Sequence, residues 1–321
     1  EVMIRSDGVI TLLEKGIRVA SEGVAMLPHV LSAHIPLLFH DRPQEVLIAG
    51  LRGEITAYSA FIHGIGWLDI TEPSTQAVKA TRLPEWVKKR GVIEVIEARV
   101  FRIINRIDGR THLSLTNRRY DVIILNSPFP GEKLPSLDTF RLCRKRLREG
   151  GIVAVRIETG FIPSISEVLP AILRDFILVF PHACLFELLP GSDYLLLGST
   201  KKLDNDKMVS CPMQEGVKRD LERIRIKDPF DVLSRIVAGE DDLARLAKKS
   251  PPAHLPDVLT PLPVFLSYVQ ALKDFKDTRI LSELMMGENR EVLKRYLKLR
   301  EKVRDGILAE YEGDIEKALR L

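Results

Sequence analysis

Five short apolar runs between Gln44 and Thr200 decide the fold: Val46-Leu47-Ile48-Ala49, Gly66-Trp67-Leu68-Asp69-Ile70, Val92-Ile93-Glu94-Val95-Ile96, Asp121-Val122-Ile123-Ile124-Leu125 and Ile152-Val153-Ala154-Val155. Amphipathic segments separate the runs and predict helices over residues 54–62, 74–87, 99–104 and 137–147. Apolar runs that alternate with helices are typical of a parallel sheet covered on both faces. The sequence therefore predicts an α/β fold with a doubly wound, mostly parallel, Rossmann-like sheet.

The flanking segments differ in character from this central region. Short strands with Asp-Gly and Lys-Gly turns, followed by a helix, indicate an N-terminal β region over residues 1–42. The central domain spans residues 43–202; its last strands, at 177–180, 183–188 and 194–198, include a final antiparallel hairpin. Residues 203–321 are charged and helical, with helices at 217–226 and 232–247, and we expect this extension to continue into a longer parent chain.

The composition of the chain argues against several classes of protein. The 321 residues are 45% hydrophobic, enough for a packed core and about two domains. Lys+Arg 48 against Asp+Glu 44 gives a net charge of only +4, which does not favour a nucleic-acid partner. The cysteines at 143, 184 and 211 form no pair, so we expect a reducing, cytoplasmic setting without a metal site. No apolar run reaches the roughly 20 residues of a membrane segment.

Ligands bind doubly wound sheets beyond the carboxyl ends of the strands. Gly50 and Gly53 follow the first run, where glycine lets a nucleoside approach the backbone, and Asp69 near the end of the second can accept ribose hydroxyls. Glu97 ends the third run, where its carboxylate can receive an adenine amino group. Each has a structural alternative: a tight turn for the glycines, an N-cap for Asp69 and a favourable helix-start charge for Glu97.

Several segments resemble the spermidine/spermine synthase (polyamine aminopropyltransferase) family, which shares the fold of class I S-adenosylmethionine-dependent methyltransferases. These segments are His34-Ile35-Pro36-Leu37-Leu38-Phe39-His40, Tyr120-Asp121-Val122-Ile123-Ile124 and Leu147-Arg148-Glu149-Gly150-Gly151-Ile152. The resemblance covers roughly residues 1–200. It implies transfer of an aminopropyl group from decarboxylated S-adenosylmethionine to a polyamine or other small amine, in a homo-oligomer or a longer multidomain chain.

The resemblance also implies the residues of the cosubstrate site. The GGGDG segment of the family falls on Gly50-Leu51-Arg52-Gly53-Glu54, its ribose-binding acid on Asp69, and its adenine-side D-A/G-R segment on Glu97-Ala98-Arg99. We therefore expect decarboxylated S-adenosylmethionine, or S-adenosylmethionine itself, to contact Gly50, Gly53, Glu54, Asp69, Glu97 and Ala98.

The acceptor side departs from the pattern of the family. Its DSxDP segment falls on Asn126-Ser127-Pro128-Phe129-Pro130, so Asn126 occupies the catalytic acid position but cannot take a proton from an amine. Its Tyr-His-Glu segment falls on Pro28-His29-Val30 and keeps only the histidine. His29, Ser127 and Glu158 remain as expected substrate-binding residues.

These residues leave three hypotheses about the function. The first is an aminopropyltransferase-like enzyme with an altered acceptor site, in which Glu132, Glu158 or Glu187 supplies a replacement carboxylate. The second is a non-catalytic domain that senses a nucleoside or acts as a scaffold. The third is a methyltransferase that uses S-adenosylmethionine, with Asn126-Ser127-Pro128 orienting an acceptor amine.

Overall fold

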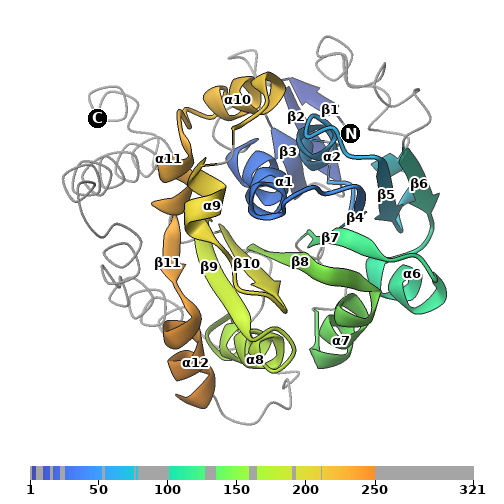
Figure 1. The fold of residues 1–321 in the computed structure, drawn as a ribbon. Coiled ribbons are helices and arrows are strands. Elements are labelled where there is room, and N and C mark those ends of the chain that lie inside the picture. Colours follow the sequence, from blue (N-terminus) through green and yellow to red (C-terminus); the bar gives the residue numbers. More distant parts are fainter. Residues whose placement is uncertain are drawn as a thin grey trace.

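The computed structural model describes residues 2–4, 10–14, 17–21, 26–52, 55–75, 77–78, 101–126, 135–158, 165–189, 193–210 and 212–249. Its main sheet consists of β4 (Glu45–Ala49), β5 (Trp67–Glu72), β6 (Phe101–Asn105), β7 (Tyr120–Leu125), β8 (Leu147–Glu158), β9 (His182–Leu189), β10 (Asp193–Ser199) and β11 (Ile236–Ala238). The strand order is β11-β9-β10-β8-β7-β4-β5-β6 (Figure 1). A separate three-stranded antiparallel sheet contains β1 (Val2–Ile4), β2 (Ile10–Glu14) and β3 (Ile17–Ser21).

The main sheet has a parallel part and an antiparallel part. Strands β6, β5, β4, β7 and β8 are parallel neighbours, whereas β10, β9 and β11 continue the sheet with antiparallel pairing. The predicted doubly wound sheet and its final hairpin are therefore confirmed. Strand order reverses at β4, which lies between β5 and β7, so the ligand edge of such a sheet is expected at the carboxyl ends of these strands.

Helices cover both faces of the sheet. On one face lie α1 (Leu27–Phe39), α2 (Ile55–Phe61), α9 (Asn205–Ser210), α10 (Glu215–Glu222) and α11 (Pro229–Leu233). On the other face lie α6 (Gly109–Leu115), α7 (Leu137–Arg146), α8 (Ile165–Ile177) and α12 (Glu240–Lys249). Figure 1 shows α1 and α2 on one side of β7 and β8, with α7 and α8 on the opposite side.

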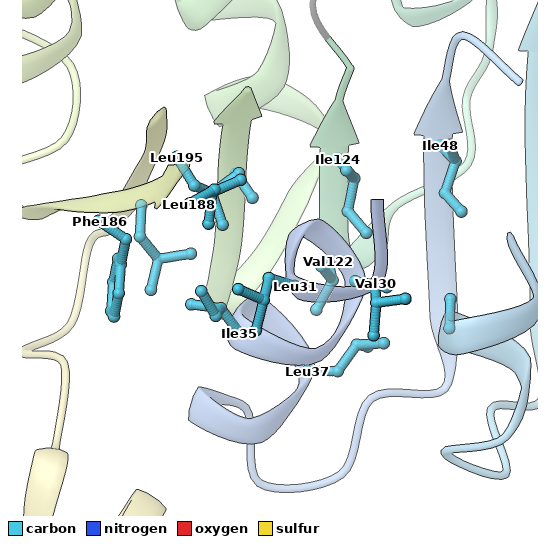
Figure 2. Close-up of a cluster of buried hydrophobic side chains, with 14 of the residues drawn as sticks. Val30, Leu31, Ile35, Leu37, Ile48, Val122, Ile124, Phe186, Leu188 and Leu195 are labelled. Carbon is cyan, nitrogen blue, oxygen red and sulfur yellow. The ribbon is translucent and has the colours of Figure 1, made fainter. Parts of the chain in front are cut away.

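Strand alternation explains why both faces are apolar. Successive side chains of a strand point to opposite faces, so Val122 and Ile124 pack towards α1 while Ile123 packs towards α7 and α8. Figure 2 shows Val30 and Leu31 of α1 among side chains from β4, β7, β9 and β10. Every strand in the centre of the sheet therefore needs an unbroken apolar run.

Three local predictions are wrong. The helix expected over 99–104 is contradicted from residue 101 onward, because β6 occupies Phe101–Asn105 and pairs with β5. Residues 177–180 do not form a strand, since α8 continues to Ile177 and ends in a turn. The expected helix over 232–247 is split into α11, β11 and α12, because β11 pairs with β9. Short apolar segments carry too few residues to reveal their period.

A buried polar network connects α10 to α1 and α2. His34 Nε2 lies 3.0 Å from Asp220 Oδ2, and His34 Nδ1 lies 2.8 Å from His63 Nε2. Asp220 also accepts hydrogen bonds from Ser59 Oγ, at 2.6 Å, and from Arg223. Burial and the neighbouring His34 lower the pKa of His63 to about 3, so His63 is neutral near pH 7.

None of the helices that the structure describes is both long and apolar enough to cross a membrane. Across the same ranges, no cluster of three or more His, Cys, Asp or Glu side chains is arranged to hold a metal ion.

Candidate nucleoside site

The turn after β4 lies where the strand order reverses. Gly50 has a φ of +91°, in the region that favours glycine, and its N–H donates to the carbonyl of Thr71 at 2.9 Å. Its own carbonyl accepts a 2.6 Å hydrogen bond from Asn126 Nδ2. The Asn126 backbone N–H in turn donates to the carbonyl of Ala49 at 3.0 Å. The structure thus brings together Gly50 and Asn126, two of the predicted site residues.

Two buried oxygen atoms at this edge have no hydrogen-bond partner among the described residues. One is Oδ1 of Asn126, whose residue is only 8% exposed, and the other is Oγ1 of the fully buried Thr71. Buried polar atoms in folded proteins are nearly always paired, because an unpaired one costs about 1–3 kcal/mol. Such atoms at the carboxyl edge of a doubly wound sheet are suited to contact a polar ligand.

Asp69 does not end the second strand as predicted. It is the third residue of β5, which runs on to Glu72, and its side chain is fully buried. Its carboxylate accepts hydrogen bonds from Arg102 Nε at 2.9 Å and Nη2 at 3.0 Å, Trp67 Nε1 at 3.0 Å and Tyr120 Oη at 2.7 Å. Burial opposes ionisation of Asp69, but these donors outweigh it and lower its pKa. Asp69 is therefore a structural carboxylate within the sheet.

The carboxylate at the end of β5 belongs to Glu72. Its Oε2 accepts from the backbone N–H of Leu51, in the turn after β4, at 3.0 Å, and its Oε1 accepts from the N–H of Ser74 at 2.8 Å. Glu72 is thus held directly beside the Gly50 turn, where Asp69 was expected. The sequence offered a signal, since the β-branched residues Ile70 and Thr71 favour continuation of the strand until Pro73.

β6 is the next strand of this edge among the described residues, whereas the predicted run over 92–96 lies outside them. Glu97 and Ala98 lie outside the described residues, but β6 ends at Asn105 and is followed by Asp108-Gly109-Arg110 at the start of α6. Asp108 Oδ1 accepts from the N–H of Thr111 at 2.9 Å and caps the helix. Partial burial opposes ionisation, yet the Thr111 donors prevail and lower the pKa of Asp108.

Asp108-Gly109-Arg110 matches the D-A/G-R pattern more closely than Glu97-Ala98-Arg99 does. Glycine is required at position 109, because a Cβ there would collide with Cβ of Ala49 at the end of β4. The start of α6 thus lies directly against the first strand of the site. Because a helix was expected over 99–104, the sequence did not predict that a strand ends just before Asp108.

Three further predicted residues cannot be placed. Gly53, Glu54 and Ser127 lie outside the described residues, as does the candidate replacement carboxylate Glu132. In the sequence, Gly53 and Glu54 follow β4, and Ser127 and Glu132 follow β7.

The two described residues of the expected acceptor side, His29 and Glu158, meet at Arg156. Nη2 of Arg156 lies 3.6 Å from Glu158 Oε2, and its Nη1 lies 3.3 Å and 3.4 Å from the ring nitrogens of His29. The principal partner of Arg156 is Asp193, whose carboxylate accepts from Nε at 3.0 Å and 3.1 Å and from Nη2 at 2.6 Å. Sequence analysis missed both Arg156 and Asp193.

Arg52 contributes a second guanidinium to this region. It is buried, and its φ of 45° places it in the left-handed region that costs a side-chain-bearing residue about 1 kcal/mol. Burial raises the pKa of Asp193 to about 6, although the positive charges of Arg156 and Arg52 act in the opposite direction. Burial alone would lower the pKa of Arg156, but the Asp193 and Glu158 carboxylates raise it, so Arg156 stays charged.

Sequence comparisons give curated relatives at modest identity. No family model matches the chain. Polyamine aminopropyltransferases from Pseudomonas syringae pv. tomato and Nitrosomonas europaea are 26% and 28% identical over 154 and 167 residues. These matches cover 46% and 50% of this chain, and 51% and 50% of the two relatives. The chain therefore spans about half the length of the curated relatives it matches.

Solved structures show the same fold. A spermidine synthase from Thermotoga maritima has a TM-score of 0.56 and 18% identity, covering 84% of this chain and 83% of that chain. A spermidine synthase in complex with the transition state analogue AdoDATO has a TM-score of 0.54 and 20% identity, covering 69% and 84%. The chain is thus similar in sequence to polyamine aminopropyltransferases over about half of its length, and similar in fold to spermidine synthases.

Proposed function

We propose that the carboxyl edge formed by β4, β5, β6 and β7 binds the nucleoside of an S-adenosylmethionine-type cosubstrate, with decarboxylated S-adenosylmethionine as the first candidate. The observation that carries this proposal is the meeting of the left-handed Gly50 turn, the Glu72 carboxylate and the unpaired Asn126 Oδ1 at the point where strand order reverses. The curated relatives named polyamine aminopropyltransferases support the choice of cosubstrate.

Each residue receives a role from its position. Gly50 lets the ligand approach the backbone, and Glu72 at the end of the second strand accepts the ribose hydroxyls. Asp108, which follows β6 and caps α6, receives the adenine amino group. Asn126 Oδ1 accepts a hydrogen bond from the ligand at the end of β7.

The reaction that this site would perform is aminopropyl transfer to a small amine. The amine nitrogen forms a bond to the propyl carbon while the sulfur–carbon bond breaks, and its electron pair neutralises the sulfonium to give methylthioadenosine. An alkylammonium with a pKa of about 10.4 must first lose a proton, which requires a base. The Asn126 amide cannot accept that proton. This observation favours a second candidate, a domain that binds the nucleoside without catalysis.

Calorimetric titration with methylthioadenosine tests the site. We expect a Kd near or below about 100 µM, which is roughly −5.5 kcal/mol. The Glu72→Gln variant keeps an acceptor for the backbone but loses the charge, so its binding should weaken at least tenfold, by about 1.4 kcal/mol. Tighter binding of S-adenosylhomocysteine than of methylthioadenosine would instead favour the methyltransferase reading.

The matched control is Glu215→Ala, which removes an exposed carboxylate paired with Arg219 on α10. It should bind methylthioadenosine as the wild-type protein does. If folded wild-type protein gives no heat with either nucleoside at millimolar concentration, the proposed function is wrong.

A further inference from the structure

Arg156 is enclosed by three elements at the carboxyl end of β8. The residue is 4% exposed, and its guanidinium forms three hydrogen bonds to Asp193, the first residue of β10. Glu158 lies directly across the ladder from Asp193 and contributes a second carboxylate to the same guanidinium. His29 of α1 lies against its Nη1. The cation is thus fixed in place by groups from β8, β10 and α1.

Asp193 and Glu158 form the kind of site that an alkylammonium requires. A buried ammonium is stable only where carboxylates pair with it within hydrogen-bond distance. Here the carboxylates already hold a cation belonging to the protein. Arg52, whose charge also acts on Asp193, joins this region to the turn after β4 and thus to the proposed nucleoside site.

We propose that Arg156 is a specificity-determining residue that occupies the Asp193–Glu158 carboxylates in place of a substrate ammonium and so excludes polyamines from this subsite. The inference deepens the proposed function and rests on it for the role of this subsite as the acceptor side. Displacement of Arg156 by a polyamine would leave its guanidinium buried and unpaired, a cost of several kcal/mol. The acceptor, if there is one, is therefore not a polycation held by these carboxylates.

Removal of the built-in cation should open the subsite. We expect the full chain to give no saturable heat with spermidine up to about 10 mM, whereas Arg156→Gln should bind it at least tenfold more tightly, with a Kd of about 1 mM or below. The titration is done at pH 8.5 and low ionic strength, where Asp193 is ionised and the amines keep their protons. Adding Asp193→Asn to Arg156→Gln should abolish the gained binding.

Two further variants keep the test decisive. Arg148→Gln is the matched control. Arg148 lies at the opposite end of β8 from Arg156, and its guanidinium pairs with the buried Asp121 of β7. It should gain no spermidine binding. Arg156→Lys retains a cation near Asp193, so it too should gain none.

Three results would overturn the proposal: saturable spermidine binding by the wild-type protein that Asp193→Asn removes, a folded Arg156→Gln protein without gained binding, or equal gains in Arg156→Lys and Arg156→Gln. Methylthioadenosine is titrated into the same proteins. Its failure to bind would refute the proposed nucleoside site while leaving the spermidine comparison intact, so the two failures are distinguishable.

Discussion

The Asp69→Ala variant should lose about 3 kcal/mol of unfolding free energy, because the substitution removes a buried carboxylate that accepts four hydrogen bonds. Trp67 Nε1 would lose its acceptor, whereas Tyr120 Oη would keep His112 Nε2, 2.8 Å away, as a partner. The Arg102 side chain is 49% exposed and can return to water, so it adds little to the cost. Urea unfolding, followed by circular dichroism, measures the change as a shift of the midpoint.

The control for this prediction is Asp138→Ala, which removes an exposed carboxylate on α7 and should change stability by less than about 0.5 kcal/mol. Acid titration gives a second test. The folded-state pKa of Asp69 is lowered, so its contribution is present above the unfolded pKa, near 3.8, and is lost as pH falls through the folded pKa. Asp69→Asn should lack this acid-dependent loss. An Asp69→Ala protein as stable as Asp138→Ala would contradict the structural role of Asp69.

The Gly198→Ala variant should also be destabilised by about 3 kcal/mol. A Cβ at this position in β10 would lie 2.5 Å from Cε1 and Cζ of Phe176 and 2.9 Å from Cβ of Phe180. The Phe176 ring is fully buried, with its centroid 5.1 Å from that of Phe140 and 5.0 Å from that of Phe180, so it cannot move aside. Overpacking of this kind strains rotamers and backbone. Thermal and urea unfolding both report the loss.

Gly216→Ala provides the matched glycine control. Its added Cβ would lie 3.6 Å from Cβ of Ile62, an ordinary contact, and alanine is favoured over glycine within a helix by about 0.5–1 kcal/mol. This variant should be slightly more stable than the wild-type protein. Equal stability of the two alanine variants would show that α8 does not hold Phe176 in the described position.

The fold was predictable because apolar runs of four or five residues mark central strands. Val46–Ala49 and Asp121–Leu125 match β4 and β7 closely, and the final hairpin matches β9 and β10. The outer strands of the sheet were harder to predict. Among the described strands, β6 and β11 each have a neighbour on one side only, so their sequences carry weaker patterns. β11 pairs with β9, a partner that is distant in the sequence.

The site was predictable only in part, because its geometry depends on where each strand ends. Gly50 and Asn126 directly follow well-marked runs and were found. Asp69 was preferred to Glu72 because a parallel strand's end cannot be read from alternation when both faces are buried. The ion pair of Arg156 and Asp193 joins residues 37 apart on antiparallel strands, a contact that no local pattern reveals.

The hydrogen bond between His34 and Asp220 spans 186 residues of sequence. A ribosome adding about 5–20 residues per second would release the Asp220 carboxylate roughly 10–40 s after the histidine that it contacts. Until then, the His34 side chain has to remain hydrated, and α1 cannot pack fully against the sheet on that side. Part of the segment that looked like a charged appendage thus completes the packing around α1, and nascent chains that end before Asp220 should remain open to proteases and chaperones.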